Sequence, residues 1–315
     1  MGTRGRHWHC LPRSRRPVYG GGMDHRTEVR EFLISRRAKI TPQMAGLPAY
    51  GGNRRVAGLR REEVAMLSGM SVDYYTRLER GNLGGASEGV LESLALALQL
   101  DDAERQHLFD LARTANMGSL SVARARRKSV ATKVRPSLQR VLDAISAPAW
   151  VRNDRLDFLA SNTLGAALYA PVLTSAAQPS NSARFCFLDA GAHDFYVDWT
   201  TVANDIVAVL RAEAGRHPFD AALTELVGEL STRSEDFRVR WADHNVRFHR
   251  TGRKKLHHPV VGELDLTYEA MLLPADPGLT LFVYTALPDS PTQAALDFLA
   301  SWASDPVQSG LATRP

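Results

Sequence analysis

The residues whose types and spacing are most informative lie between Leu59 and Gly81, in the run LRREEVAMLSGMSVDYYTRLERG. Gly69 is free to adopt the positive φ of a tight turn. Ser71 is suited to accept a hydrogen bond from an unpaired backbone N–H at the start of the next helix. Gly81 stands where glycine commonly ends a helix. The run therefore predicts two short helices joined by a tight turn.

The second of these helices has one face available for contact with a partner. Tyr75 and Leu78, three residues apart, are expected to hold it against a core. The outward residues near its N-terminus are Val72, Asp73, Tyr74, Thr76 and Arg77. In a helix-turn-helix this end enters the major groove of DNA, where arginine donates to guanine and aspartate accepts from the cytosine amino group. The predicted chemistry is sequence-specific contact with double-stranded DNA.

Other polar residues around the same motif are candidates for contact with DNA, mostly with its phosphates. These are Arg54, Arg55, Arg60, Arg61, Ser71 and Arg80. The first two belong to residues 40–58, a Gly- and Pro-rich connection that is longer than a minimal motif needs. For Arg61, Arg77 and Arg80, the alternative interpretation is a solvated face or a salt bridge. Glu79 is expected to pair locally.

Charge is divided unevenly along the 315 residues. Residues 1–133 contain 23 Lys and Arg against 13 Asp and Glu, whereas residues 134–315 contain 16 against 21. A basic first part suits a polyanionic partner, although the basic run of residues 124–128 is equally compatible with a solvated linker. The composition, 44% hydrophobic and 23% charged, is typical of a globular protein with material for two cores.

Other classes of protein are not indicated. No run approaches the roughly 18 apolar residues of a membrane span, and the basic N-terminus lacks the apolar stretch of a secretory signal. Cys10 and Cys186 are too few for a disulfide framework or a zinc site, which suggests a reduced, cytoplasmic protein. Cys186, in an apolar run, is expected to be a buried and inert thiol.

The sequence also predicts no metal, no cofactor and no enzyme activity. The four histidines between His244 and His258 are not spaced as metal ligands on one helix face. His193, Asp194 and Asp198 lie beside an expected helix start, so capping is favoured over acid–base catalysis. A nucleophile elbow, a catalytic triad and a glycine-rich phosphate loop are all missing from the pattern.

Helical periodicity dominates the first part of the chain. Apolar residues at helical spacing, with capping residues before them, predict helices over 24–39, 59–67, 71–80 and 87–98, and a fifth that Asp101 caps. The basic stretch that follows is low in large apolar residues and indicates a linker. We therefore expect an all-α domain of five helices.

The pattern changes after Ala149. Two short strands joined at Asn153 and Asp154 precede a helix that extends to Tyr169, and further helices are expected over 195–214 and 218–230. Alternation in residues 264–270 predicts a third strand, and a turn over 274–278 leads into a fourth over 279–287, before a last helix over 292–302. A mixed sheet with helices packed on it makes an α+β domain.

The predicted organisation has two domains between three less ordered segments. The boundaries are a basic, disordered extension (1–23), the DNA-binding domain (24–116), a linker (117–135), the α+β domain (136–303) and a disordered tail (304–315).

The run from residue 59 to 81 resembles the Cro/C1-type (Xre) helix-turn-helix family. In that resemblance Val72, Asp73 and Arg77 stand at base-reading positions, and Arg61 and Arg80 at positions that approach the DNA. With the phrases VRNDRLDFLASN and HHPVVGELDLTYEAMLLPADPGLTLFVYTA, the chain resembles the actinobacterial MmyB-type regulators. The resemblance implies a PAS-like ligand-binding domain after the helix-turn-helix, and a dimer that reads a near-palindromic operator.

A PAS-like domain implies that part of its aromatic core lines a cavity. The candidate lining residues are Trp150, Phe158, Phe187, Trp199, Tyr268 and Phe282. One interpretation is a sensor of a small apolar molecule, such as one resembling a fatty acid. The other is a module for dimerisation or protein interaction that binds no ligand.

Overall fold

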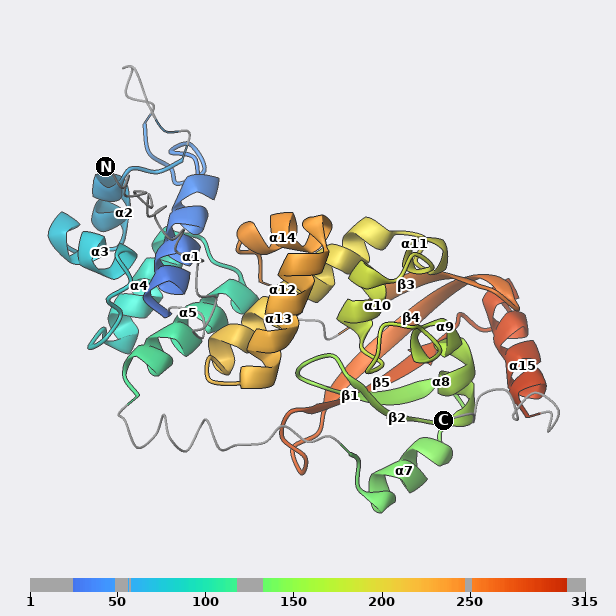
Figure 1. Ribbon diagram of the computed structural model, residues 1–315. Helices are drawn as coiled ribbons and strands as arrows, with labels where there is room; N and C mark the ends of the chain where they lie inside the picture. The colour runs from blue at the N-terminus through green and yellow to red at the C-terminus, as the bar shows by residue number, and fades with distance from the viewer. Residues whose placement is uncertain (1–24, 49–55, 57, 118–132, 247–250, 305–315) are drawn as a thin grey trace, which may run out of the picture.

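The chain forms a helical part and a sheet part, with long helices between them (Figure 1). The computed structural model describes residues 25–48, 56, 58–117, 133–246 and 251–304. We call residues 25–117 the N-terminal domain and residues 133–304 the C-terminal domain. Within the described residues, no helix is long and apolar enough to cross a membrane.

The helices of the N-terminal domain lie within the predicted ranges. They are α1 (His25–Lys39), α2 (Arg61–Leu67), α3 (Val72–Glu79), α4 (Glu88–Ala97) and α5 (Asp102–Ala115). Ser71 caps α3 by accepting from the Tyr74 N–H, and Asp101 caps α5 by accepting from the Glu104 N–H. The turn between α2 and α3 contains Gly69 at φ +67°, as the sequence predicts.

The strands of the C-terminal domain form one sheet in the order β2-β1-β5-β4-β3. They are β1 (Ala149–Asn153), β2 (Phe158–Ser161), β3 (Thr251–His258), β4 (Gly262–Leu272) and β5 (Leu279–Thr285). Every pairing is antiparallel, so the expectation of a mixed sheet was wrong. The connections explain three of the four pairs: short turns join β1 to β2, β3 to β4 and β4 to β5, and such turns allow only antiparallel pairs.

The helices of this domain follow β2, except for one before the sheet and one after it. They are α7 (Pro136–Asp143), α8 (Thr163–Leu168), α9 (Ala170–Leu173), α10 (Ser182–Leu188), α11 (Ala192–Phe195), α12 (Trp199–Arg216), α13 (Ala221–Arg233), α14 (Glu235–Ala242) and α15 (Pro291–Ala303). The predicted helix from residue 195 begins instead at Trp199, because Asp198 accepts from the Thr201 N–H and caps α12. Capping was the predicted role of Asp198.

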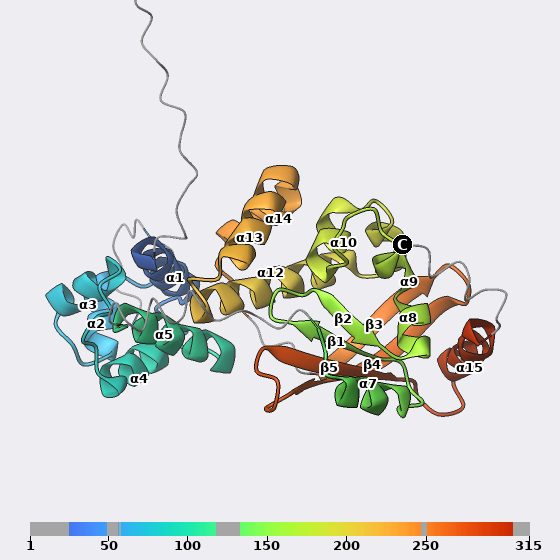
Figure 2. The ribbon, with the colours of Figure 1, turned by 60° about the horizontal axis from the view of Figure 1, so that its bottom comes forward.

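Alternation along the strands divides the sheet into two buried faces. Trp150 and Phe282 are paired across β1 and β5, and belong to the large core that includes residues of α8, α10 and α12. Val151 and Leu281, also paired, contact a smaller core with Leu138 of α7. Figure 2 shows α7 on one side of the sheet and α10 and α12 on the other. This two-sided packing directs Trp150, Phe282 and their neighbours on the same face toward α12.

Gly81, at φ +93°, gives a test of how α3 is held against α1. A Cβ on Gly81 would lie 2.4 Å from the carbonyl oxygen of Arg26, whereas a Cβ on Gly69 would meet nothing within 4 Å. Gly69→Ala should cost about 1 kcal/mol of unfolding free energy, because only the left-handed backbone penalises it. Gly81→Ala should cost about 3 kcal/mol or more, because α1 must also move. Equal losses in urea unfolding would contradict this packing.

Candidate functional sites

Helix α3 presents an exposed surface from its first turn to its last. Val72, Asp73 and Arg77 are exposed, while Tyr74 and Thr76 are half-buried. The Arg77 guanidinium lies over the Tyr74 ring, 4.7 Å from its centroid. Tyr75 and Leu78 are buried in the core of the N-terminal domain, as their spacing predicts. The helix therefore offers a valine, an aspartate and an arginine on one accessible face.

The basic residues around α3 differ in their surroundings. Arg60 and Arg80 are exposed at the starts or ends of helices. Arg61 forms an ion pair with Glu79, although about half of its side chain stays exposed (49%). Arg54 and Arg55 lie outside the described residues. Arg60, Arg77 and Arg80 are thus presented to solvent, while Arg61 is shared between Glu79 and solvent.

Glu79 is a buried carboxylate at the end of α3. Its Oε1 accepts from Arg37 Nε at 2.6 Å and from the Tyr75 hydroxyl at 3.1 Å, and its Oε2 accepts from Arg61. Burial opposes the charged form, but the hydrogen bonds from Arg37 and Arg61 outweigh it and lower the pKa of Glu79. Glu79 pairs within its own domain, but its two arginine partners lie 18 and 42 positions away in the sequence. Arg37 was missed, because no sequence pattern links it to a residue 42 positions away.

A small cavity lies between the sheet and α12. Its volume is about 30 Å³, and its walls include Trp150, Phe282 and Tyr284 from the sheet. Four wall residues belong to α12: Val202, Asp205, Ile206 and Val209. A cavity of this size has room for little more than a water molecule. A larger molecule enters only if the walls move.

Two cations line this cavity together with one carboxylate, Asp205. The Arg152 guanidinium lies 4.7 Å from the centroid of the Phe282 ring, and Lys254 Nζ lies 5.7 Å from the Tyr196 ring centroid. Burial, and then the charge of Arg152, lower the pKa of Lys254 to about 8. Burial likewise lowers the pKa of Arg152. Such a wall suits a molecule with an acidic group, because an anion would offset the cost of burying both cations.

The six aromatic residues predicted to line a cavity are placed differently. Trp150 and Phe282 line it, and Phe158 stacks on Trp150 with a centroid distance of 3.7 Å. Tyr268 is not among the residues that line the cavity, and its ring centroid lies 6.0 Å from that of Phe282. Phe187 and Trp199 contact each other at 6.0 Å outside the wall.

The cations of the wall were missed by the sequence reasoning, although a signal was present. Arg152 follows Trp150 by two residues, and Lys254 precedes the apolar Leu256 by two. Residues at this spacing share one face of a strand. Charged residues on an inward face are therefore the pattern that could have identified them.

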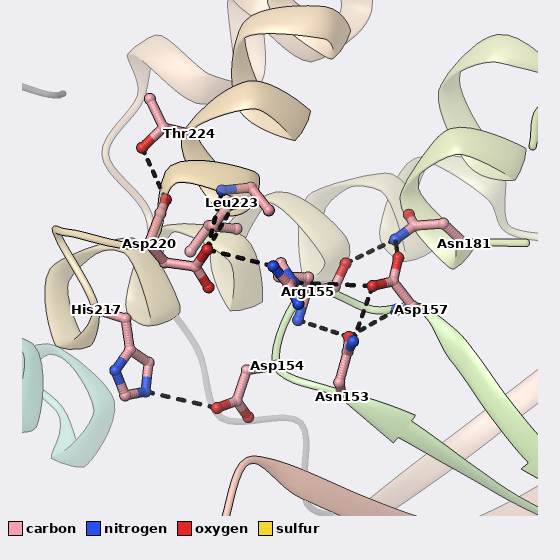
Figure 3. Close-up of polar contacts among 10 residues, drawn as sticks. Asn153, Asp154, Arg155, Asp157, Asn181, His217, Asp220, Leu223 and Thr224 are labelled. Atoms are coloured by element: carbon pink, nitrogen blue, oxygen red, sulfur yellow. Dashed lines mark hydrogen bonds and ion pairs between the residues drawn. The ribbon is translucent and has the colours of Figure 1, made fainter. Parts of the chain in front are cut away.

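The turn between β1 and β2 is fastened to the helices by ion pairs and hydrogen bonds (Figure 3). Arg155 lies between Asp157, at 3.8 Å, and Asp220, at 3.4 Å, and Asp220 caps α13. Asn181 donates to Asp157 at 2.7 Å. This network fixes the end of β1, and with it the position of Arg152.

Asp154, Glu213 and His217 form a second cluster at this turn, and their ligand atoms lie within 4.8 Å of one another. Arg216 already donates to both Glu213 oxygens, at 2.8 and 3.0 Å. Burial, and then the charge of Asp154, raise the pKa of Glu213 to about 7. Because a guanidinium supplies the positive charge, we interpret the cluster as an ion-pair network rather than a metal centre.

Cys186 lies in α10 and is buried, as expected. Burial raises the pKa of its thiol to about 12, which keeps it protonated at neutral pH. Its structural role is to pack within the core of the C-terminal domain.

Comparison with known families agrees with this division of the chain. Residues 134–299 match the family model described as the MmyB-like transcription regulator ligand binding domain. Residues 53–108 match the helix-turn-helix domain model, which includes α2, α3 and α4. A comparison with curated proteins gave no match.

The Glu79 cluster predicts a pH-dependent stability. The folded-state pKa of Glu79 lies below its ordinary value of 4.5, so its stabilising effect is present above that value and is lost as the pH falls below it. Glu79→Gln should cost about 3 kcal/mol at pH 7, because two arginines lose their counter-charge. The variant should also lose less stability than the wild type between pH 5 and pH 3.

Urea unfolding at each pH measures this effect, and Glu88→Gln is the control because Glu88 is exposed. The proposed pairing is wrong if Glu79→Gln and Glu88→Gln have the same stability at pH 7.

Proposed function

Because this chain belongs to the MmyB-like transcription regulator family, matched over more than half of its residues, we propose that it binds a specific DNA operator and that a small ligand regulates this binding. The observation that carries the DNA-binding half is the exposed face of α3 beside buried Tyr75 and Leu78. A helix that is buried against the core on one face and exposed on the other can enter a major groove without refolding.

The proposed division of roles follows from where the side chains lie. Val72, Asp73 and Arg77 read base edges, with Arg77 donating to a guanine and Asp73 accepting from a cytosine. Arg60, Arg61 and Arg80 contact phosphates, and Arg54 and Arg55 do so from the preceding connection. Ser71, Tyr74 and Thr76 complete the surface at the helix start. Phosphate neutralisation then supplies most of the affinity, and α3 supplies the specificity.

We propose a homodimer, because one helix-turn-helix reads only a half-site and two copies read a near-palindrome. The C-terminal domain, with helices on both faces of a five-stranded antiparallel sheet, is compatible with a PAS-like fold. In this proposal the protein acts in the cytoplasm, without a cofactor, a membrane or a catalytic role.

The ligand we propose is amphipathic rather than simply apolar. Trp150, Phe282 and Val209 offer apolar surface, while Arg152 and Lys254 offer positive charge at the same cavity. A molecule with an apolar body and one carboxylate satisfies both. The alternative is a C-terminal domain that only mediates protein contacts, and the small volume of the cavity, about 30 Å³, is the observation that favours it.

The DNA-binding proposal predicts a base-specific role for Arg77. Arg77→Ala should weaken binding to the best operator by about 1–3 kcal/mol and relax the preference at one base position. Selection of DNA from a random pool, followed by titration of wild type and variant, measures both effects. Arg238→Ala, which removes another exposed arginine from α14, is the control. An equal loss on every DNA sequence would show that Arg77 contacts only phosphate.

The ligand proposal predicts that charge at the cavity selects the ligand. Dodecanoate should bind, and Lys254→Met should weaken its binding about tenfold or more, because a charge-assisted hydrogen bond is lost. Dodecanol, which has the same chain without the charge, should respond little to this variant. Titration calorimetry measures both ligands.

Lys255→Met is the matched control, since Lys255 is the exposed neighbour of Lys254 on β3. Failure of both ligands to bind would favour the protein-interaction alternative.

A further inference from the structure

Helix α12 is shared between the cavity and the boundary of the two domains. Val202, Ile206 and Val209 line the cavity, while Arg211 and Gly215, two and six residues after Val209, lie against the N-terminal domain. The helix is buried over most of its length, from Val202 to Gly215. Figure 2 shows it extending from α10 beside the sheet to α1 and α5. Helix α12 therefore has one end at the cavity and the other at the domain boundary.

The boundary is held by a buried charged cluster, which we call the latch: Glu28, His107, Arg211 and His244. Arg211 Nη1 donates to Glu28 Oε1 at 2.6 Å and lies 2.9 Å from His244 Nδ1. The carboxylate oxygen of Glu28 is 3.7 Å from a ring nitrogen of His107 and of His244. Burial opposes the charge on Glu28, but the two histidines and Arg211 outweigh it and hold the pKa of Glu28 far below its usual range.

A short segment after α14 completes the contact. Val246 is buried in the core of the N-terminal domain, and the His244 carbonyl accepts from Arg36 at 2.5 Å. His244 Nε2 lies 2.9 Å from Glu31, and Asn245 accepts from Lys39 at 2.6 Å. The C-terminal domain thus inserts a histidine, an asparagine and a valine beside α1.

The latch has the chemistry of a contact that can open. Arg211 and Glu28 are almost fully buried, at 1% and 8% exposure, and water would solvate both charges again if the domains separated. His107 is buried with neither ring nitrogen hydrogen-bonded among the described residues. Contacts of this kind contrast with the apolar core of each domain, which loses its burial energy when it opens. Opening of the boundary therefore returns its charges to water, and Val246 is the apolar residue that the segment after α14 would expose.

We propose that α12 transmits the state of the cavity to the N-terminal domain by keeping this latch closed or releasing it. The cavity is too small for a ligand unless its walls move, and four wall residues lie on α12. Movement of α12 at Val209 also displaces Arg211, two residues away, because the helix is rigid and closely packed. When the latch is closed, it fixes the orientation of α3 relative to the C-terminal domain. When the latch is open, α3 is free to change its orientation. The effect on DNA rests on the proposed DNA-binding function.

Gly215→Ala opens the latch without removing any charge. A Cβ on Gly215 would lie 2.4 Å from Cε1 of His107, and that ring is buried against Phe32, with a centroid distance of 4.9 Å. Because this ring is almost fully buried, we expect α12 and α5 to move apart to make room. Gly228→Ala is the matched control, because a Cβ on that glycine of α13 meets nothing within 4 Å. Glu28→Ala is a second route to release, since it leaves the buried Arg211 without a carboxylate to balance its charge.

Small-angle scattering of the full chain measures release, circular dichroism confirms folding, and titration with the selected operator measures DNA binding. Gly215→Ala and Glu28→Ala should increase the radius of gyration and weaken operator binding about tenfold, within the usual range of allosteric coupling. Gly228→Ala should match the wild type. Ile206→Trp, which enlarges a cavity wall of α12, should release the domain in the same way without any added molecule.

Folded Gly215→Ala and Glu28→Ala proteins with the radius of the wild type would overturn the latch. A folded Ile206→Trp protein that stays compact would overturn transmission through α12. A wild type that binds no operator would instead contradict the proposed function, and the scattering result would still decide whether the latch exists.

Discussion

The packing of α12 on all sides from Ile206 to Gly215 is the constraint on which the rest of the structure depends. A helix whose residues are all buried from Ile206 to Gly215 cannot shift at one point without moving its neighbours, because a protein interior is close-packed. It forms one wall of the cavity, carries Arg211 to the domain boundary and approaches α5 so closely that only glycine fits at 215. Together with the segment after α14, which inserts Val246 beside α1, this helix sets the position of the proposed DNA-binding surface relative to the sheet.

Buried charge has three different consequences in this protein. Glu79 has two arginines and a tyrosine as partners, so its charge secures α3 within one domain. Glu28 and Arg211 pair across the domain boundary, where separation would return both to water. Arg152 and Lys254 share a wall with one carboxylate, which leaves positive charge for an acidic ligand to balance. The charges at all three places carry a desolvation cost because they are buried. The number and location of their partners decide whether the charge stabilises one domain, joins the two domains or faces a cavity.

The local features of the fold could be predicted because each depends on residues close in sequence. The cap at Ser71, the turn at Gly69 and the cap at Asp198 are of this kind. Strands β1, β2, β4 and β5 were recognisable from the sequence, β4 from its alternation and the others from the turns beside them. The mixed sheet was wrong, because alternation shows which face is buried but not which strands pair or in which direction.

The sequence by itself determined the elements of the DNA-binding surface, since Val72, Asp73 and Arg77 face outward as soon as Tyr75 and Leu78 face the core. Three pairings of charge were decided only by the tertiary structure. Arg61 and Arg37 both donate to Glu79. Arg152 and Lys254 line the same cavity, and Glu28 pairs with Arg211 across the domain boundary. The reason is the distance along the sequence over which each kind of interaction acts. Periodicity and capping act over one or two turns, whereas these charges come from segments up to 183 positions apart and are brought together only by burial.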